Sequence, residues 1–205
     1  MKTAALGFRM HSGWGAVVAV SPEDKFEVVE RRHIALTESN DPGLKQPYHH
    51  VENLELKVAE EYLAKCSAIS GQLALTAVRE MLTQLAGIKY QVRACAILTA
   101  SGRTLPSLEK VLASHALIHQ AEGEFFRAII HKGCEEAGLA VTRLQERALE
   151  DEVRKTFGRK ANQLSRRISG LGKRLGPPWT QDEKLAALAA ALVLVSSEPS
   201  VAAGL

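Results

Sequence analysis

The stretch ALGFRMHSGWGAVVAV, residues 5–20, joins two apolar runs through the turn His11-Ser12-Gly13. A short glycine-containing turn between two such runs predicts a β-hairpin, with strands over residues 6–10 and 14–20. Arg9 falls near the end of the first strand, among apolar neighbours. The hairpin therefore starts the fold, and its arginine is the first candidate functional residue.

The composition is that of an ordinary soluble globular protein. The chain has 205 residues, of which 46% are hydrophobic and 24% charged, and this length can bury a continuous core. Its three cysteines have no CxxC spacing and lie in apolar surroundings, which predicts reduced core thiols and a cytoplasmic protein. The first ten residues are too short and too soon interrupted for a signal peptide, and the apolar run 185–195 is too short to span a bilayer. We expect no membrane partner.

The remaining pattern alternates strands and helices. Residues 26–36, 90–100 and 139–144 read as strands, and residues 53–85, 105–137 and 181–195 as helices, with a bend near residues 70–71. The predicted order is β-β-β-α-β-α-β-α. We expect an α/β protein in which one domain spans residues 1–195, followed by a disordered tail over residues 196–205.

Two short motifs give a resemblance. LGFRMHSGWGAVV (residues 6–18) is similar to the L-G-I-D-P-G-S…G-W-G-V opening of the RuvC branch of the ribonuclease-H-like superfamily, with a shorter turn. WTQDEKLAALAAALVL (residues 179–194) is similar to that family's closing helix. The resemblance runs from residue 6 to residue 195. It implies a mixed sheet with helices on both faces, and it is closer to bacterial relatives without the usual carboxylates than to working Holliday-junction resolvases.

The family's nuclease chemistry uses carboxylates from the first strand, the fourth strand and the last helix to hold two divalent metals. At the corresponding positions this chain has Arg9, a carboxylate-free strand end (residues 98–100) and Asp182. The resemblance therefore implies a hydrolase ancestry without the standard two-metal centre. Asp182 stays a candidate catalytic residue, although Thr180 and Glu183 around it also form a helix-capping box.

A concentrated basic segment indicates a polyanionic partner. Residues 153–176 contain eight basic residues and no acidic one: Arg154, Lys155, Arg159, Lys160, Arg166, Arg167, Lys173 and Arg174. The whole chain carries +3, so the rest of it carries −5. Three glycines interrupt the run, which favours a mobile, phosphate-seeking segment over a stable helix, although a solvated basic helix is the alternative. We expect nucleic acid, DNA or RNA, to contact Arg166 and Arg167, with Trp179 either stacking on a base or packed under the turn.

The middle helix carries a polar cluster on its apolar side. His115, His119 and Glu122 fall within about 60° of one another around the helix axis, on the face that should pack against the sheet. A buried carboxylate needs a cation or hydrogen-bond donors, and Arg9, His11 and Arg103 are the expected partners of Glu122.

Three interpretations of this cluster remain open. It is a satisfied structural network, or a site for one divalent metal (Zn²⁺, Fe²⁺ or Mg²⁺) held by His115, His119 and Glu122, or a metal-free acid–base site that also uses His11. In the last case Arg9, Ser12 and Arg103 would hold an anionic substrate, because TASGR (residues 99–103) precedes the helix. The histidines of QPYHH (residues 46–50) also permit metal binding, but an exposed polar loop explains them equally well.

The function that best unites these features is nucleic-acid binding by a ribonuclease-H-like, RuvC-like protein without the usual nuclease centre. One alternative is a metal- or His/Glu-dependent hydrolase of a small phosphorylated substrate. Another is a non-catalytic interaction module related to the actin-like ATPases, which share the opening three strands. The sequence leaves open whether the protein is an enzyme and whether it forms a homodimer.

Overall fold

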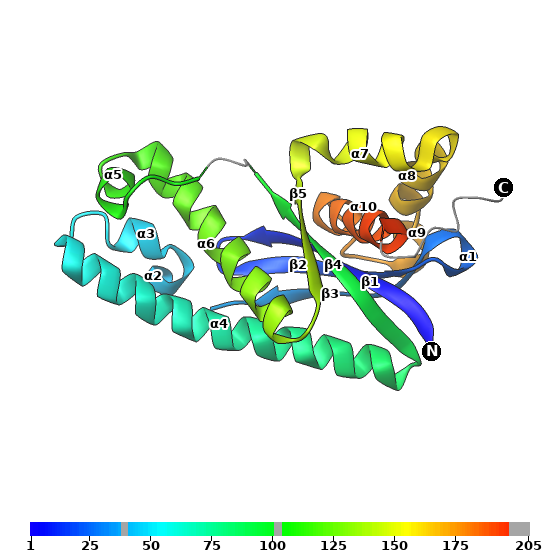
Figure 1. The fold of residues 1–205 in the computed structure, drawn as a ribbon, viewed down its shortest axis with the longest axis horizontal. Coiled ribbons are helices and arrows are strands. Elements are labelled where there is room, and N and C mark those ends of the chain that lie inside the picture. Colours follow the sequence, from blue (N-terminus) through cyan, green and yellow to red (C-terminus); the bar gives the residue numbers. More distant parts are fainter. Residues whose placement is uncertain (38–40, 101–103, 197–205) are drawn as a thin grey trace.

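A five-stranded mixed sheet forms the centre of the computed structural model, which describes residues 1–37, 41–100 and 104–196 (Figure 1). The sheet order is β3-β2-β1-β4-β5. The strands are β1 (Lys2–His11), β2 (Trp14–Ser21), β3 (Glu27–Ala35), β4 (Tyr90–Thr99) and β5 (Ala140–Gln145). β1, β2 and β3 pair antiparallel, whereas β4 pairs parallel with β1 and β5 pairs parallel with β4. The α/β class and the mixed sheet predicted from the sequence are confirmed.

The expected hairpin is formed by β1 and β2. His11 pairs with Trp14 across a two-residue turn, and Arg9 pairs with Ala16. Gly13 has a φ of 78°, a conformation that glycine adopts without the steric cost of a side chain.

Helices connect and cover the strands. The short ones are α1 (Glu23–Phe26), α2 (Pro42–Lys45), α3 (Pro47–His50), α5 (Leu108–Leu112) and α9 (Gly172–Leu175), with two 3₁₀ turns, η1 (Glu146–Ala148) and η2 (Gly158–Lys160). The longer ones are α4 (Leu56–Gly87), α6 (His115–Glu136), α7 (Leu149–Phe157), α8 (Ala161–Gly170) and α10 (Gln181–Ser196).

The two faces of the sheet bury separate apolar clusters. α10 lies against β1 and β2, with α7 and α8 packed on the same side, whereas α4 and α6 cover the opposite face (Figure 1). Side chains of β1 alternate between these faces, so that Phe8 and Met10 contact the α4–α6 side and Gly7 faces α10. A Cβ at Gly7 would lie 1.9 Å from the carbonyl oxygen of Ala186, so only glycine permits this close strand–helix approach.

α4 runs as one continuous helix through residues 70–71, where a bend was expected. Two other local expectations are wrong. The helix expected over residues 105–137 is two helices that meet at Ala113 and Ser114. QPYHH is not an irregular loop, since residues 47–50 form α3.

The basic segment is also helical. α7 and α8 have polar outer faces and bury Val153, Leu164 and Ile168 in the same cluster as α10, and this apolar anchoring outweighs the glycines that suggested an irregular chain. The three cysteines are buried free thiols, as expected. No helix in the described part of the chain is long and apolar enough to cross a membrane. The expected tail falls, after Ser196, outside the described residues.

Candidate functional sites at the sheet edge and on helix α6

Arg9 joins two carboxylates at the carboxyl end of β1. Its Nε donates to Oε2 of Glu146 at 3.0 Å, and its Nη2 donates to Oε1 of the same residue at 2.9 Å. Its Nη1 donates to Oδ1 of Asp182, at the start of α10. The guanidinium thus makes a two-pronged ion pair with the residue that follows β5 and a further bond to α10, in a partly buried setting. We call Arg9, His11, Glu146 and Asp182 the Arg9 cluster.

His11 completes the Arg9 cluster. Its Nε2 lies 3.1 Å from Oδ1 of Asp182 and 3.3 Å from Nη1 of Arg9, and its ring stacks on Trp14 at a centroid distance of 4.5 Å. Burial lowers the pKa of His11, and the positive charge of Arg9 lowers it further, against an opposing effect of Glu146. The neutral imidazole is therefore favoured in the folded protein.

A pocket of about 680 Å³ opens beside the Arg9 cluster. Its walls come from the ends of β1 and β4, from η1 and α7, from the start of α10 and from Arg127 of α6. The carboxyl ends of parallel strands are where α/β proteins place their ligand sites. The pocket carries mixed charge, with four arginines and three acidic residues in its lining: Arg9, Arg127, Arg147, Arg154, Glu146, Glu150 and Asp151.

The N-terminus of α10 has the expected capping box. The backbone N–H of Thr180 donates to Oε2 of Glu183 at 2.6 Å, and the Thr180 hydroxyl lies 2.8 Å from the same oxygen and accepts from the N–H of Asp182. Nε2 of His33 lies 2.6 Å from the other carboxylate oxygen of Glu183. Burial alone would raise the pKa of Glu183, but the hydrogen bonds from Thr180 and His33 outweigh it and lower that pKa.

Trp179 packs under the turn before α10. Its Nε1 donates to the carbonyl of Ile168 at 2.8 Å, and the indole lies against the α10-side apolar cluster. Arg31 contacts the same turn, donating from Nη2 to the carbonyl of Leu175 at 2.6 Å and from Nη1 to that of Gly176 at 3.0 Å. The packed alternative for Trp179 therefore holds in this structure.

The expected pairing of Arg9 with Glu122 is wrong. Arg9 follows Gly7 on the α10 face of β1, because alternate residues of a strand share a face, whereas Glu122 belongs to α6, which covers the other face. The proposed cavity shared by Arg9, His11 and the α6 cluster is likewise wrong. The sequence-predicted residues form two separate groups.

Glu122 is buried against α3. Only 3% of it is exposed, and it accepts hydrogen bonds from Nδ1 of His49 at 2.7 Å and from the backbone N–H groups of His49 and Tyr48 at 3.3 and 3.4 Å. Burial raises the pKa of Glu122, and these three bonds oppose the increase. The donors that satisfy this carboxylate therefore come from QPYHH rather than from β1.

The ring of His49, which contacts Glu122 through Nδ1, also lies beside the rings of His115 and His119. One ring nitrogen of each lies within 4.8 Å of those of the other two, and Nε2 of His115 is 3.0 Å from Nε2 of His119. His115 and His119 are exposed, whereas His49 is half-buried. We call these three residues the histidine cluster. The structure places His49, and not Glu122, beside the two histidines of α6.

The other predicted site residues are placed as follows. Ser12 lies in the turn after His11 and is absent from the described lining of the sheet-edge pocket. Arg166 is exposed on α8, and Arg167 is half-buried next to a separate hollow near Phe157. Arg103 lies outside the described residues.

Three side chains of the candidate sites were not predicted from the sequence. Glu146 was recognisable as an acidic residue directly after a parallel strand, where its side chain meets the ends of β1 and β4. His49 was noticed only as part of a polar loop, because residues 47–50 are too few for helical periodicity to show. His33 was hidden in a strand of mixed polarity, and its contact with Glu183 depends on how the start of α10 packs against the sheet.

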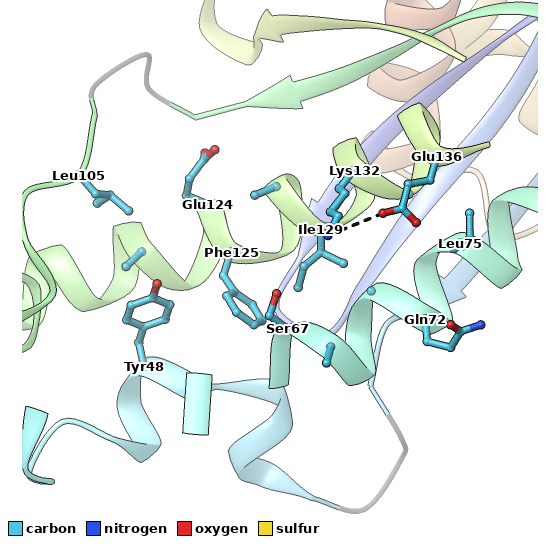
Figure 2. A pocket seen from close by; sticks show the side chains of 15 residues that line it. Tyr48, Ser67, Gln72, Leu75, Leu105, Glu124, Phe125, Ile129, Lys132 and Glu136 are labelled. Carbon is cyan, nitrogen blue, oxygen red and sulfur yellow. Dashed lines mark ion pairs between the residues drawn. The ribbon is translucent and has the colours of Figure 1, made fainter. Parts of the chain in front are cut away.

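A second hollow of about 460 Å³ lies between α4 and α6. Figure 2 shows its apolar lining, with Phe125 and Ile129 on α6 and Leu75 on α4, and an ion pair between Lys132 and Glu136 at its rim. Tyr48 closes one end of this groove, next to the histidine cluster. The groove itself gathers no set of catalytic groups in the described residues.

The fold matches solved structures of RuvC from Thermus thermophilus. RuvC in complex with Holliday junction substrate matches with a TM-score of 0.53 and 11% identity, over 95% of this chain and 94% of that chain. A second Thermus thermophilus RuvC structure matches with a TM-score of 0.52 and 10% identity, over 95% of each chain. No protein-family model matches this sequence, and no curated protein does. The chain has the RuvC-type, ribonuclease-H-like fold.

Proposed function

We propose that this protein binds nucleic acid through its ribonuclease-H-like domain and does not cleave it by the two-metal route. The observation that carries the proposal is the position of Arg9, with its guanidinium bonded to both carboxylates at the carboxyl end of the sheet. In the resolvase family this is where carboxylates hold metal.

The side chains of the Arg9 cluster do not fit a pair of Mg²⁺ ions. Mg²⁺ requires near-octahedral oxygen ligands at about 2.0–2.1 Å. Here the oxygens of Glu146 and one oxygen of Asp182 already accept hydrogen bonds from the guanidinium cation of Arg9. A metal would have to displace this cation and leave it unpaired. The arginine instead neutralises charge that would otherwise repel a phosphate backbone.

Exposed cations on η2, α8 and α9 supply a surface for that backbone. Arg159, Lys160, Arg166, Lys173 and Arg174 are exposed, and none of them has an ion pair with another described residue. By contrast, Arg154 and Lys155 on α7 pair with acidic residues of the same helix. These five exposed cations are therefore well placed to exchange counterions for phosphates, which makes binding depend on salt.

A salt titration with charge-reversed variants tests the proposal. A four-way DNA junction is the first ligand, because one of the similar RuvC structures holds a Holliday junction; duplex DNA, single-stranded DNA and RNA are compared with it by fluorescence anisotropy. The double variant Arg159→Glu/Arg166→Glu should bind at least tenfold more weakly, and the slope of log K against log salt should fall by about 2 for a duplex ligand.

The matched control is Lys57→Glu/Lys65→Glu, which changes the net charge equally on the exposed side of α4. It should bind nearly as tightly as the wild type. Equal losses in the two double variants would mean that only overall charge matters, and absence of binding to every ligand at low salt would refute the proposal.

A further inference from the structure

The histidine cluster lies at the contact between α3 and α6. His115 is the first residue of α6 and His119 follows one turn later, so both side chains leave the same side of the helix. His49 belongs to α3, and its ring makes edge-to-face contacts with the rings of His115 and His119. Figure 1 shows α2, α3 and α5 gathered around the start of α6, away from β5 and α10. The cluster is eight residues, or about 12 Å, along α6 from Arg127, which lines the sheet-edge pocket.

We propose that His49, His115 and His119 bind one Zn²⁺ ion through their ring nitrogens, with Glu122 orienting His49 and a fourth coordination position open. This inference is independent of the proposed nucleic-acid binding, because it uses none of the Arg9 cluster or the basic helices.

The distances fit one ion. Zn²⁺ bound by histidine nitrogens at 2.0–2.1 Å in a tetrahedron separates those nitrogens by about 3.3 Å. Nε2 of His115 and Nε2 of His119 are 3.0 Å apart, and the nitrogen of His49 lies within 4.8 Å of both.

Glu122 sets the tautomer of His49. An ionised carboxylate only accepts hydrogen bonds, so Nδ1 of His49 carries the proton in the 2.7 Å contact, and Nε2 keeps its lone pair. Such carboxylate–histidine pairs are the usual support of zinc-binding histidines. Two backbone N–H groups of α3 also donate to Glu122, which fixes the carboxylate and therefore the ring.

Packing holds α3 against α6. Tyr48, the residue before His49, makes an edge-to-face contact with Phe125 at a centroid distance of 6.0 Å, and its ring points toward α6 in Figure 2. On the other side of His49, His50 stacks on Tyr62 of α4 at 4.4 Å. The backbone that carries His49 is thus anchored on both sides, so that the cluster is largely preorganised.

The ligand set favours Zn²⁺ over the oxygen-seeking ions. Three neutral imidazoles offer nitrogen donors and no carboxylate oxygen, whereas Mg²⁺ and Ca²⁺ prefer oxygen. Three histidines with an open fourth position are the ligand number of catalytic zinc sites. The exposure of His115 and His119 gives the ion and a fourth ligand access from solvent. A purely structural network accounts for the bond from His49 to Glu122 and for one hydrogen bond between His115 and His119, but it does not require the ring nitrogens of all three histidines to converge within 4.8 Å.

Zinc titration of the untagged full-length chain, after chelator treatment, tests the site. Calorimetry should give one Zn²⁺ per chain at micromolar protein concentration. His115→Ala and His119→Ala should each lower the affinity at least 100-fold, and these exposed positions leave the fold intact by circular dichroism. Co²⁺ in place of Zn²⁺ should give the visible absorption of a tetrahedral nitrogen site in the wild type but not in His115→Ala or His119→Ala.

His131→Ala is the matched control, because His131 is also on α6 but pairs with Glu135 outside the cluster. It should bind zinc as the wild type does. Glu122→Gln should weaken binding about 10–100-fold with the same stoichiometry, as expected for a residue that orients a ligand. Absence of stoichiometric binding in the wild type, or equal binding in the wild type and His119→Ala, would overturn the zinc site without touching the nucleic-acid proposal.

Discussion

Two buried glutamates in this chain each contact a histidine, and their pKa values shift in opposite directions. Glu183 is 1% exposed and contacts His33 at 2.6 Å; Glu122 is 3% exposed and contacts His49 at 2.7 Å. The pKa of Glu183 is lowered, whereas that of Glu122 is raised. Burial raises both pKa values, and it acts more strongly on Glu122, which is surrounded by more protein. The other donors add to the difference, because Thr180 gives Glu183 contacts of 2.6 and 2.8 Å, whereas α3 gives Glu122 bonds of 3.3 and 3.4 Å.

The surroundings of the two glutamates differ in the same way. Near Glu183, the guanidinium cation of Arg9 pairs with the carboxylates of Glu146 and Asp182. Next to Glu122, the neighbours are imidazoles, whose lone pairs a metal can share. We propose that similar residue types therefore give a site closed to metal at the sheet edge and a site open to metal on α6.

The largest expected effect comes from opening the closed site. Arg9→Asp removes the guanidinium and places a third carboxylate beside Glu146 and Asp182, a set of hard oxygen ligands suited to Mn²⁺ or Mg²⁺. Without metal the variant should melt well below the wild type, because like charges repel. At Mn²⁺ concentrations about tenfold above its Kd, its Tm should rise by about 3–6 °C, measured by calorimetry.

Arg9→Lys serves as the control for this change, since it keeps the positive charge. Its Tm should respond to Mn²⁺ no more than that of the wild type, and the histidine cluster is common to all three proteins. A wild-type protein that responds to Mn²⁺ as strongly as Arg9→Asp would show that Arg9 does not close the site.

The sequence predicted which residues lie at the carboxyl end of β1 and at the start of α10 better than it predicted which residues they contact. The hairpin, the position of Arg9 at its end and the capping box at Thr180 followed from local pattern, because turn chemistry and helix starts depend on residues close in sequence. The pairing of Arg9 with Glu146 spans 137 residues and depends on which strands are neighbours. Strand alternation, applied to Gly7, Phe8 and Arg9, would have separated Arg9 from Glu122.

The histidine cluster illustrates the same limit. His115, His119 and Glu122 were identified together because helical spacing is written in the sequence. His49 could not be added, because its proximity depends on a four-residue helix packed between two long ones, and no periodicity reports such a contact. Likewise the basic segment was judged from its glycines, although the buried apolar residues of α7 and α8 determine its helices.

A smaller effect compares the two glutamates by pH. Glu183→Gln and Glu122→Gln are unfolded with urea between about pH 3.5 and 7.5 with chelator present, starting from an ordinary glutamate pKa of 4.5. Because the folded pKa of Glu183 is lowered, its ionisation stabilises the wild type above pH 4.5, and that advantage over Gln disappears as pH falls through the folded value. Because the folded pKa of Glu122 is raised, the wild type loses stability relative to Gln as pH rises from 4.5 through the folded value. Parallel curves for the two variants would contradict the contrast.

The smallest effect concerns His11 alone, and it separates the charge of Arg9 from the burial that accompanies it. Burial lowers the pKa of His11 whatever its neighbours are, whereas the contribution of Arg9 requires the guanidinium. In Arg9→Gln the pKa of His11 should rise, because the positive neighbour is gone and Asp182, 3.1 Å away, can stabilise the imidazolium without competition. An NMR titration of the imidazole resonances measures this, with His131 as the internal reference that should not move. If the pKa of His11 stays unchanged, then Arg9 is already fully neutralised by Glu146 and Asp182, and the closed site presents no net positive charge to a phosphate.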